Sequence, residues 1–252
     1  MRTVSVVGIG AGNPEHVTVQ AISTLNAADV VFMMDKGDGA RELLDFRREI
    51  CARYITSPSR RTVTAPDPGR PRGPGSGRAV QDWRTRRAEI YGQLIAGELG
   101  SHGHGAFLAW GDPAIYDGTV DVLRQVLAQG TVSFELRVVP GISSVQALAA
   151  QHQISLTRAG RPLHVTTGRL LARGFPGHAD DVVVMLDPEC AFTGMDADLD
   201  IYWGAGVGGA REVLISGRVA DVGQRIVAAR TAARSRDGGV MDTYQLRRPD
   251  SR

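Results

Sequence analysis

The chain has 252 residues, of which 42% are apolar and 22% are charged, and its formal net charge is +2. This length suits one large domain or two smaller ones with a substantial core, and the balanced charge argues against a surface that binds polyanions in general. Lys36 is the single lysine, which excludes a G-K-[ST] phosphate loop and leaves Lys36 as the one possible Schiff-base residue.

Two cysteines, Cys51 and Cys190, occur without metal-ligand spacing. We expect buried free thiols in a reducing compartment, and no metal site. The N-terminus lacks the long apolar core of a signal peptide, and no apolar run reaches the roughly 18 residues that a membrane span requires. The sequence therefore predicts a cytoplasmic protein without membrane or nucleic-acid partners.

The first 55 residues alternate between strand and helix patterns. Thr3–Ile9 is a β-branched run that ends at glycine, Val17–Ala28 has apolar residues at helical spacing, and Asp29–Met34 is a second apolar run. A further helix is predicted over Gly39–Ile55. Strand, helix and strand joined by short connections predict a parallel βαβ unit.

Proline and glycine dominate the segment Thr64–Arg78, which has no apolar side chain larger than alanine apart from proline. Such a composition predicts an exposed, mobile loop. The segment interrupts an α/β pattern rather than separating two complete ones. We therefore interpret it as a lid or a surface excursion, not as a linker between domains.

The pattern changes near Ile154. Before it, a helix is predicted over Gln81–Gly100, and strand, turn and helix follow each other twice, over Gly105–Gly130 and Phe134–Ile154. After it, strand patterns dominate, with one clear helix over Ala220–Arg234; the predicted strands are 162–167, 181–186, 200–205, 212–219 and 239–248. We expect a parallel-sheet α/β domain over residues 1–139 and a mixed-sheet α+β domain over 140–252.

Three turns follow strands of the N-terminal half: Gly8–Pro14, Gly111–Ile115 and Pro140–Ser144. In open α/β sheets, ligands bind outside the carboxyl ends of the strands. We therefore expect all three turns at one sheet edge, beside a ligand.

The first turn partly matches a dinucleotide-binding loop, because glycine occupies positions 8, 10 and 12 and Asp35 follows the second strand. Asn13, however, stands where the G-x-G-x-x-G pattern requires its last glycine. An NAD-linked oxidoreductase and a tight turn without a ligand are both open alternatives at this point.

Three quoted stretches, "GIGAGNPEHVTVQAISTLNAADVV", "GDPAIYDGTV" and "VVPGISSVQALAA", together resemble the tetrapyrrole methylases, a family dependent on S-adenosylmethionine (SAM). The resemblance covers essentially the whole chain, with the motifs in the family's order. Gly111–Pro113 and Pro140–Ser144 match the family pattern, whereas Asn13 replaces an aspartate. The resemblance implies a two-domain fold with the active site in the cleft between an N-terminal α/β domain and a C-terminal mixed-sheet domain. It also implies a homodimer.

Further stretches, such as "RREICARY" and "VVVMLDPECAF", resemble a deacetylating branch of the family that acts in cobalamin biosynthesis. The resemblance implies that precorrin-5 loses its acetyl group as acetate and is methylated at C1 by SAM, giving precorrin-6A and S-adenosylhomocysteine. Two alternatives are another tetrapyrrole C-methyltransferase specificity and a tetrapyrrole-binding protein without turnover, which Asn13 would favour.

The resemblance also implies a set of SAM-binding residues. They are Ala11, Asp112, Ile115, Ser143, Ser144, Leu186 and Ala205. By residue type alone, Asp112 and the two serines are equally typical of helix caps, and Leu186 is typical of a core.

Deacetylation requires a general base for water and a donor to the oxyanion. Our candidates for these roles are Tyr116, Arg169 and Tyr244, with His104 and Glu189 as further possibilities. His104 lies in a glycine-rich turn and is expected to be solvated. Arginines that suit the macrocycle's carboxylates are Arg47, Arg48, Arg169 and Arg211, although a solvated surface position is the ordinary one for each.

Overall fold

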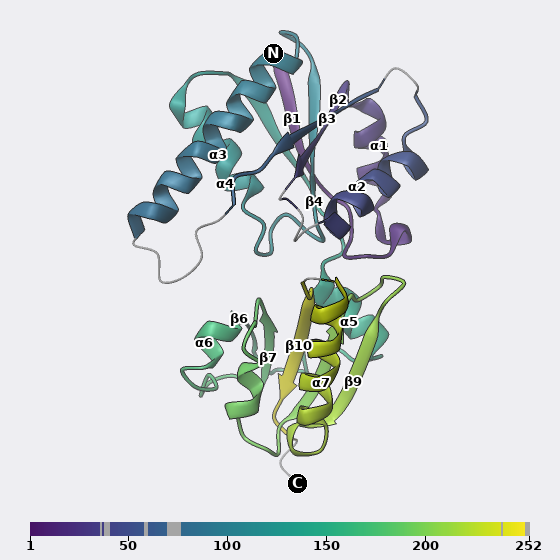
Figure 1. Ribbon diagram of the computed structural model, residues 1–252, viewed down its shortest axis with the longest axis vertical. Helices are drawn as coiled ribbons and strands as arrows, with labels where there is room; N and C mark the ends of the chain where they lie inside the picture. Colours follow the sequence, from purple (N-terminus) through teal and green to yellow (C-terminus); the bar gives the residue numbers. More distant parts are fainter. Residues whose placement is uncertain (36, 38–40, 58–59, 70–76, 238, 250–252) are drawn as a thin grey trace. The chain divides into compact units, whose positions relative to one another are not determined.

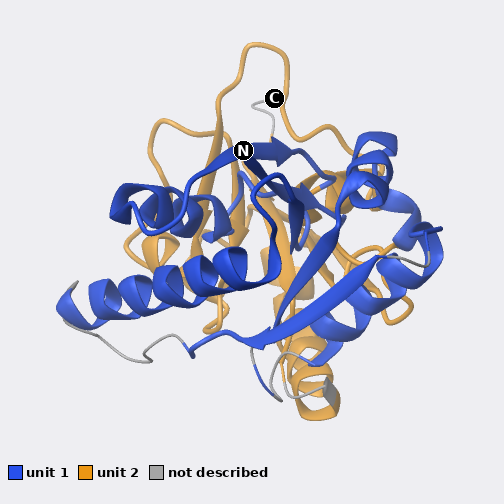
Figure 2. Ribbon diagram, turned by 90° about the horizontal axis from the view of Figure 1, so that it is seen from above, with its two compact units in different colours: residues 1–10, 14–142 blue, residues 11–13, 143–252 orange. Residues whose placement is uncertain are grey.

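A computed structural model describes residues 1–35, 37, 41–57, 60–69, 77–237 and 239–249. The contacts divide the chain into two compact units (Figure 2). Unit 1 comprises Met1–Gly10 and Pro14–Ile142, and unit 2 comprises Ala11–Asn13 and Ser143–Arg252. A short piece of the first glycine turn is thus grouped with the C-terminal unit.

Unit 1 is built on a five-stranded parallel sheet in the order β3-β2-β4-β1-β5. Its strands are β1 (Arg2–Gly8), β2 (Val30–Asp35), β3 (Arg61–Pro66), β4 (His104–Ala109) and β5 (Phe134–Val139). Its helices are η1 (Pro14–His16), α1 (Val19–Ala27), α2 (Arg41–Tyr54), α3 (Gly77–Glu98) and α4 (Thr119–Gln129).

Helices cover both faces of this sheet, with α1 and α2 on one side and α3 and α4 on the other (Figure 1). Successive residues of β1 therefore enter different cores: Val4 and Val6 contact the α3/α4 side, and Val7 contacts the α1/α2 side. Burial on both faces explains why the strands are continuous apolar runs rather than alternating ones.

Unit 2 contains a mixed five-stranded sheet in the order β6-β7-β10-β8-β9. Its strands are β6 (Leu163–Thr167), β7 (Asp181–Met185), β8 (Asp200–Ala205), β9 (Val213–Arg218) and β10 (Asp242–Arg247). β6 and β7 are parallel and the other neighbours are antiparallel. Its helices are α5 (Ser144–Gln151), α6 (Gly168–Leu171), η3 (Ala191–Gly194) and α7 (Val219–Asp237).

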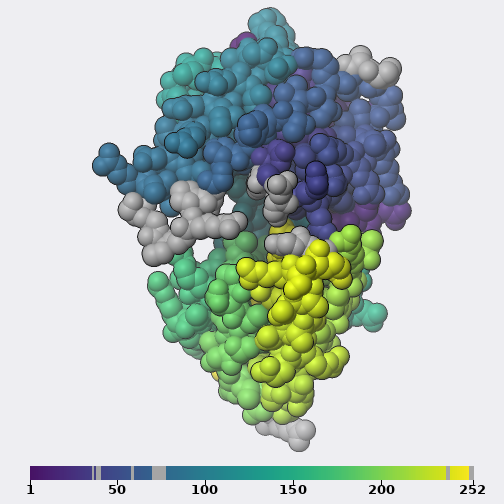
Figure 3. Space-filling view, in the orientation of Figure 1, coloured from purple at the N-terminus to yellow at the C-terminus, as the bar shows by residue number. Residues whose placement is uncertain are grey.

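One face of the second sheet packs against α6, η3 and α7 around Trp203 and Tyr244, while α5 contacts β8 and β10. The outer side of α7 forms part of the surface drawn in yellow (Figure 3). The fold class predicted from the sequence, a parallel-sheet α/β part followed by a mixed-sheet part, is confirmed.

The Thr64–Arg78 interpretation needs correction at both ends. Thr64–Pro66 belong to the edge strand β3, which pairs with β2, and α3 begins at Gly77. Asp67 is buried beside Arg87, with Oδ1 2.7 Å from Nε. The sequence pattern missed β3 because its threonines and alanine carry no apolar signal, and backbone pairing decides its conformation. Residues 70–76 of the predicted lid lie outside the described residues.

Both cysteines are free and half-buried, rather than fully buried. Burial raises the pKa of the Cys51 thiol to about 11. In the described ranges, no helix is long and apolar enough to cross a membrane, and no cluster of three His, Cys, Asp or Glu residues has metal-binding geometry.

Candidate functional site

The carboxyl ends of β4, β1 and β5 are neighbours in unit 1, so the three predicted turns do meet at one sheet edge. Gly10 and Gly111 form an isolated antiparallel bridge, in which the N–H of Gly111 donates to the carbonyl of Gly10 at 2.9 Å. A Cβ on Gly141 would lie 2.2 Å from the carbonyl oxygen of Gly111. Glycine is therefore required at position 141 because backbones touch there.

Asp112 joins two of these turns. Its Oδ1 accepts the N–H of Ala114, and its Oδ2 accepts the N–H of Gly141, both at 2.8 Å. The first bond is the local turn of an Asp-Pro sequence, and the second reaches across to the turn after β5. The half-buried carboxylate thus fixes the geometry of the edge.

The glycine loop differs from a dinucleotide cradle in its backbone. The N–H of Gly10 donates to Gly111 at 3.3 Å, so it is directed to the protein rather than to a phosphate. The short helix η1 then separates the loop from α1, whose N-cap is Thr18. A pyrophosphate site needs a helix N-terminus directly after the loop.

Tyr116 follows the turn Gly111–Ile115 and has an unusual backbone conformation. Its φ is 53° and its side chain is 49% exposed. Partial burial raises the pKa of its hydroxyl. Ile115, one residue earlier, is half-buried, and its N–H donates to Asp112 O at 3.2 Å.

In unit 2, Ser143 is the N-cap of α5 and is 2% exposed. Its Oγ accepts the N–H of Val145 at 3.2 Å, and its own N–H donates to the side chain of Gln146 at 3.1 Å. This is a capping box. Ser144 is the first, half-buried helical residue, while Ala11 and Ala205 are buried.

The end of β7 carries another Asp-Pro sequence, Asp187–Pro188. Leu186, directly before it, is 57% exposed and has a φ of 53°, which is rare for leucine. Asp187 is 4% exposed. Its Oδ2 accepts the N–H of Ala191 at 2.7 Å, and its Oδ1 accepts that of Glu189 at 3.3 Å.

Tyr244 completes this arrangement. It is 1% exposed, and its hydroxyl donates to Asp187 Oδ2 at 2.6 Å. Burial and the neighbouring carboxylate raise its pKa. A Cβ on Gly168 would lie 2.2 Å from Asp187 Oδ1, so α6 starts in direct contact with the carboxylate. Thr167, at the end of β6, has a buried Oγ1 without a hydrogen-bond partner in the described structure.

The other candidates are spread more widely. Arg169 and Glu189 are exposed. His104 begins β4, at the end of the strand opposite to Asp112, and its Nε2 lies 2.8 Å from Ser5 Oγ. It is half-buried rather than solvated, and burial lowers its pKa.

Among the arginines, Arg47 is 5% exposed, and its Nε donates to Leu108 O at the carboxyl end of β4 at 3.2 Å. Burial lowers its pKa, and no ion pair joins it to a carboxylate within the described ranges. Arg48 is exposed and pairs with Asp45 at 3.1 Å. Arg47 is therefore a buried cation without a direct ion pair among the described residues, although Asp117 and Asp67 attract it at longer range, and this arrangement suits an anionic ligand.

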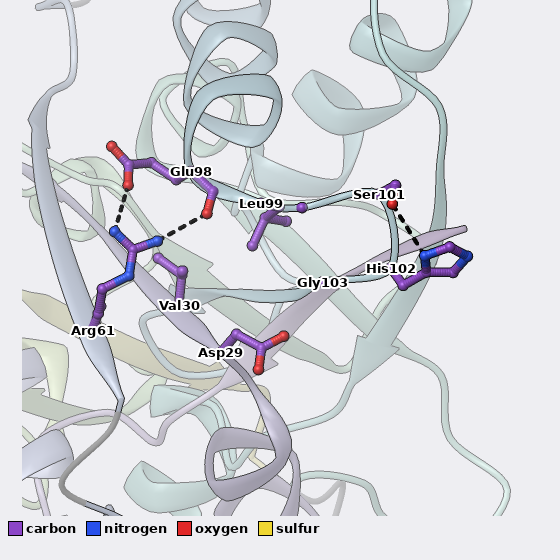
Figure 4. Close-up of a pocket in the computed structure, with 9 residues that line it drawn as sticks. Asp29, Val30, Arg61, Glu98, Leu99, Ser101, His102 and Gly103 are labelled. Carbon is purple, nitrogen blue, oxygen red and sulfur yellow. Dashed lines mark hydrogen bonds and ion pairs between the residues drawn. The ribbon is translucent and has the colours of Figure 1, made fainter.

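A pocket of about 490 Å³ lies at the opposite, amino-terminal edge of the first sheet (Figure 4). Asp29, Arg61 and Glu98 line it, and Arg61 Nη1 pairs with Glu98 Oε2 at 2.9 Å. It contains none of the predicted site residues, so it gives no support to a catalytic role.

The first sheet of this protein is parallel and has strand-end turns, and the second sheet is mixed and has its own Asp-Pro turn. Comparison with known sequences identifies the class of protein that has this arrangement. Residues 3–233 match the family model of the tetrapyrrole (corrin/porphyrin) methylases. The chain belongs to this family.

The chain is 49% identical, over 98% of its length and 96% of the relative, to the precorrin-6A synthase [deacetylating] of Sinorhizobium sp.. The crystal structure of a cobalamin synthesis related protein (CobF) from Corynebacterium diphtheriae is 32% identical, with a TM-score of 0.86, and the match covers 99% of this chain and 100% of that one. A uroporphyrin-III C-methyltransferase from Thermus thermophilus, complexed with S-adenosylhomocysteine, shares the fold at 18% identity and a TM-score of 0.56, covering 97% and 96%.

Asp187 and Arg87 are the residues that the sequence reasoning missed. A signal for Asp187 was present, because "LDPE" repeats the strand-end Asp-Pro of "GDPA". Arg87 carried no such signal: it lies in a helix with four other charged residues within seven positions of it, and only the fold brings it to Asp67.

Proposed function

We propose that the protein is a SAM-dependent C-methyltransferase of cobalamin biosynthesis that deacetylates precorrin-5 and methylates it at C1. The observation that carries this proposal is 49% identity to a precorrin-6A synthase across nearly the whole of both chains. The family membership supports SAM as the methyl donor. The glycine loop argues against an NAD-linked reaction, since the backbone of Gly10 is bonded to Gly111 of the protein itself.

The proposed chemistry balances. Water adds to the acetyl carbonyl, acetate leaves, and the electron pair of the broken C–C bond stays on C1, where the conjugated macrocycle stabilises it. SAM supplies a methyl group to that carbon, and S-adenosylhomocysteine remains. The protein must orient both reactants and exclude bulk water, because alignment alone lowers such barriers substantially.

We assign SAM binding to the residues expected from the sequence: Ala11, Asp112, Ile115, Ser143, Ser144, Leu186 and Ala205. Two local features fit this ligand. Leu186 offers an exposed apolar surface on a fixed backbone, and the unpartnered Thr167 Oγ1 can bond a polar ligand group at the adjoining strand end.

For the deacetylation step, Tyr116 is the best-placed of the proposed hydroxyl groups, because it is half exposed beside Asp112. Arg169 is exposed and forms no ion pair with the residues that the structure describes, so it remains a proposed donor to the oxyanion. A cytoplasmic location and a homodimer also remain proposals; light scattering of the purified protein tests the latter.

The first experiment is calorimetric titration with S-adenosylhomocysteine of the wild type, Asp112→Ala and Asp29→Ala. Asp29 is a matched control, because its Oδ2 accepts the N–H of His104 at 2.8 Å at the opposite edge of the same sheet. We expect binding to the wild type and Asp29→Ala, and a loss of roughly tenfold or more in affinity for Asp112→Ala.

The second experiment measures acetate release and methylation of precorrin-5 in the presence of SAM. Stoichiometric acetate and S-adenosylhomocysteine support the proposal. Methylation without acetate would point instead to another tetrapyrrole C-methyltransferase specificity. Binding of the tetrapyrrole with neither product would support the non-catalytic alternative.

A further inference from the structure

Leu186 combines backbone strain with exposure. Tyr116, Gln153, Leu186 and Cys190 are the non-glycine residues with positive φ in the described ranges. Of these, Tyr116 and Leu186 are also exposed large hydrophobic residues. A left-handed leucine is strained, and persists only where the surrounding structure enforces it.

The structure holds Leu186 from both sides. Met185, before it, is paired with Thr243 in the sheet. Asp187, after it, is fixed by its carboxylate, which accepts the N–H groups of Glu189 and Ala191. Leu186 therefore has little freedom to relax its φ as long as the carboxylate stays in place.

Tyr244 is the side-chain partner of that carboxylate. It reaches Asp187 from β10, the strand next to β7, with a hydrogen bond of 2.6 Å. Its ring packs edge-on against Phe192, with centroids 5.4 Å apart. Since Tyr244 is 1% exposed and its proton is directed to Asp187, the hydroxyl faces the protein and not a substrate.

We infer that Tyr244 is a positioning residue: through Asp187 it holds Leu186 in the left-handed conformation, where Leu186 forms a rigid apolar platform for the purine of an adenosine-containing cofactor. This inference rests on the proposed function. It replaces the sequence-based assignment of Tyr244 as a base or proton donor with an indirect role.

The test compares Tyr244→Phe with Thr243→Val. Thr243 is the neighbouring residue of β10, is 2% exposed, and donates from Oγ1 to Val184 O of β7 at 3.0 Å. Thr243→Val thus removes a buried β10–β7 hydrogen bond without touching Asp187. We expect Tyr244→Phe to weaken S-adenosylhomocysteine binding roughly tenfold, and Thr243→Val to leave it within about twofold. Equal effects in both variants, or none in Tyr244→Phe, would overturn the inference.

A double-mutant cycle with Leu186→Gly tests the route of the effect. Glycine adopts positive φ without strain, so Tyr244→Phe should change affinity by less than about twofold in the Leu186→Gly background. A persistent tenfold loss there would show that Tyr244 acts independently of Leu186, and the inference would fail.

Kinetics separate positioning from catalysis. We expect Tyr244→Phe to raise KM for SAM while kcat at saturating SAM stays close to wild type. A reduced kcat with unchanged KM would restore a direct catalytic role and overturn the inference. Absence of S-adenosylhomocysteine binding in the wild type would instead sink the proposed function, which keeps the two failures distinct.

Discussion

Two of the Asp-Pro sequences in this protein, Asp112–Pro113 after β4 and Asp187–Pro188 after β7, form the same local hydrogen bond with different support. Each carboxylate accepts the N–H two residues later, and each lies near an exposed residue with a φ of 53°. Asp112 is half-buried, and its hydrogen-bond partners among the described residues are backbone N–H groups. Asp187 is 4% exposed and has Tyr244 as a side-chain partner and Gly168 against it.

This difference shows two ways to make a strand end rigid. In unit 1, loops from neighbouring strands bond each other directly, so glycine at the contact is essential. In unit 2, a buried carboxylate collects donors from several elements, and its stability depends on a tyrosine 57 positions away. Substitutions should therefore affect the two edges through different atoms.

The largest expected effect comes from Gly141→Ala. Its Cβ would lie 2.2 Å from a backbone oxygen of the adjoining turn, which cannot move without disturbing β4. We expect roughly 3 kcal/mol or more of destabilisation, measured by urea unfolding. Gly168→Ala should cost less, because its Cβ would meet the Asp187 side chain.

Gly97→Ala is the control for both substitutions, since no atom lies within 4 Å of its added Cβ in α3. It should be neutral or stabilise the protein by up to about 1 kcal/mol. If Gly168→Ala proved as damaging as Gly141→Ala, the contrast between backbone and side-chain support would be wrong.

Asp67→Asn extends the comparison to the end of β3. The Arg87–Asp67 pair is buried, with 7% and 3% of the side chains exposed, and Arg87 also donates to Tyr91 Oη at 2.8 Å. Removing one charge leaves a buried guanidinium without its ion-pair partner, at a cost of roughly 3 kcal/mol.

The matched control is Glu98→Gln, which breaks the partly exposed pair with Arg61. It should change the free energy of unfolding by less than about 1 kcal/mol. A small effect of Asp67→Asn in chemical unfolding would contradict a structural role for the buried pair.

Asp112→Asn and Asp187→Asn compare the two carboxylates directly. Both oxygens of Asp112 accept N–H groups at 2.8 Å. The substituted amide has only one acceptor oxygen, so it loses one of these bonds and places its own NH2 group against a backbone N–H. Asp187 accepts its two short bonds on Oδ2 and a 3.3 Å bond on Oδ1, so an amide can keep the short pair. We expect S-adenosylhomocysteine affinity to fall roughly tenfold for Asp112→Asn and about threefold for Asp187→Asn.

If calorimetric titrations at one pH showed a larger loss of affinity for Asp187→Asn than for Asp112→Asn, the side-chain network at Asp187 would contribute more to ligand binding than the bonded loops at Asp112. A thermal-shift measurement of both variants without ligand controls for general destabilisation.

The smallest effect is expected for Arg47→Gln. If the buried guanidinium receives a carboxylate of the macrocycle, KM for precorrin-5 should rise about twofold with kcat little changed. Arg48→Gln, its exposed neighbour in α2, should leave KM unchanged. A loss of stability with unaltered KM would assign Arg47 to the structural contact with Leu108 instead.

The sequence by itself determined the fold class, most of the elements and the places where ligands are expected. Apolar periodicity and strand-end glycines are local signals, and the Gly111–Pro113 and Pro140–Ser144 motifs act within a few residues of the chain. The family resemblance rests on the same local stretches, so it does not depend on contacts between distant residues.

Only the tertiary structure decided the edge strand β3, the burial of Arg47 and the partners of Arg87 and Tyr244. Each depends on residues far apart in the chain: β3 on pairing with β2, Arg87 on Asp67, and Tyr244 on Asp187. Hydroxyl and charged side chains acquire their role from the donor or acceptor that folding places beside them. Composition and spacing do not show which residue that neighbour is. The sequence therefore identified the strand ends, and the fold determined which side chains stabilise them.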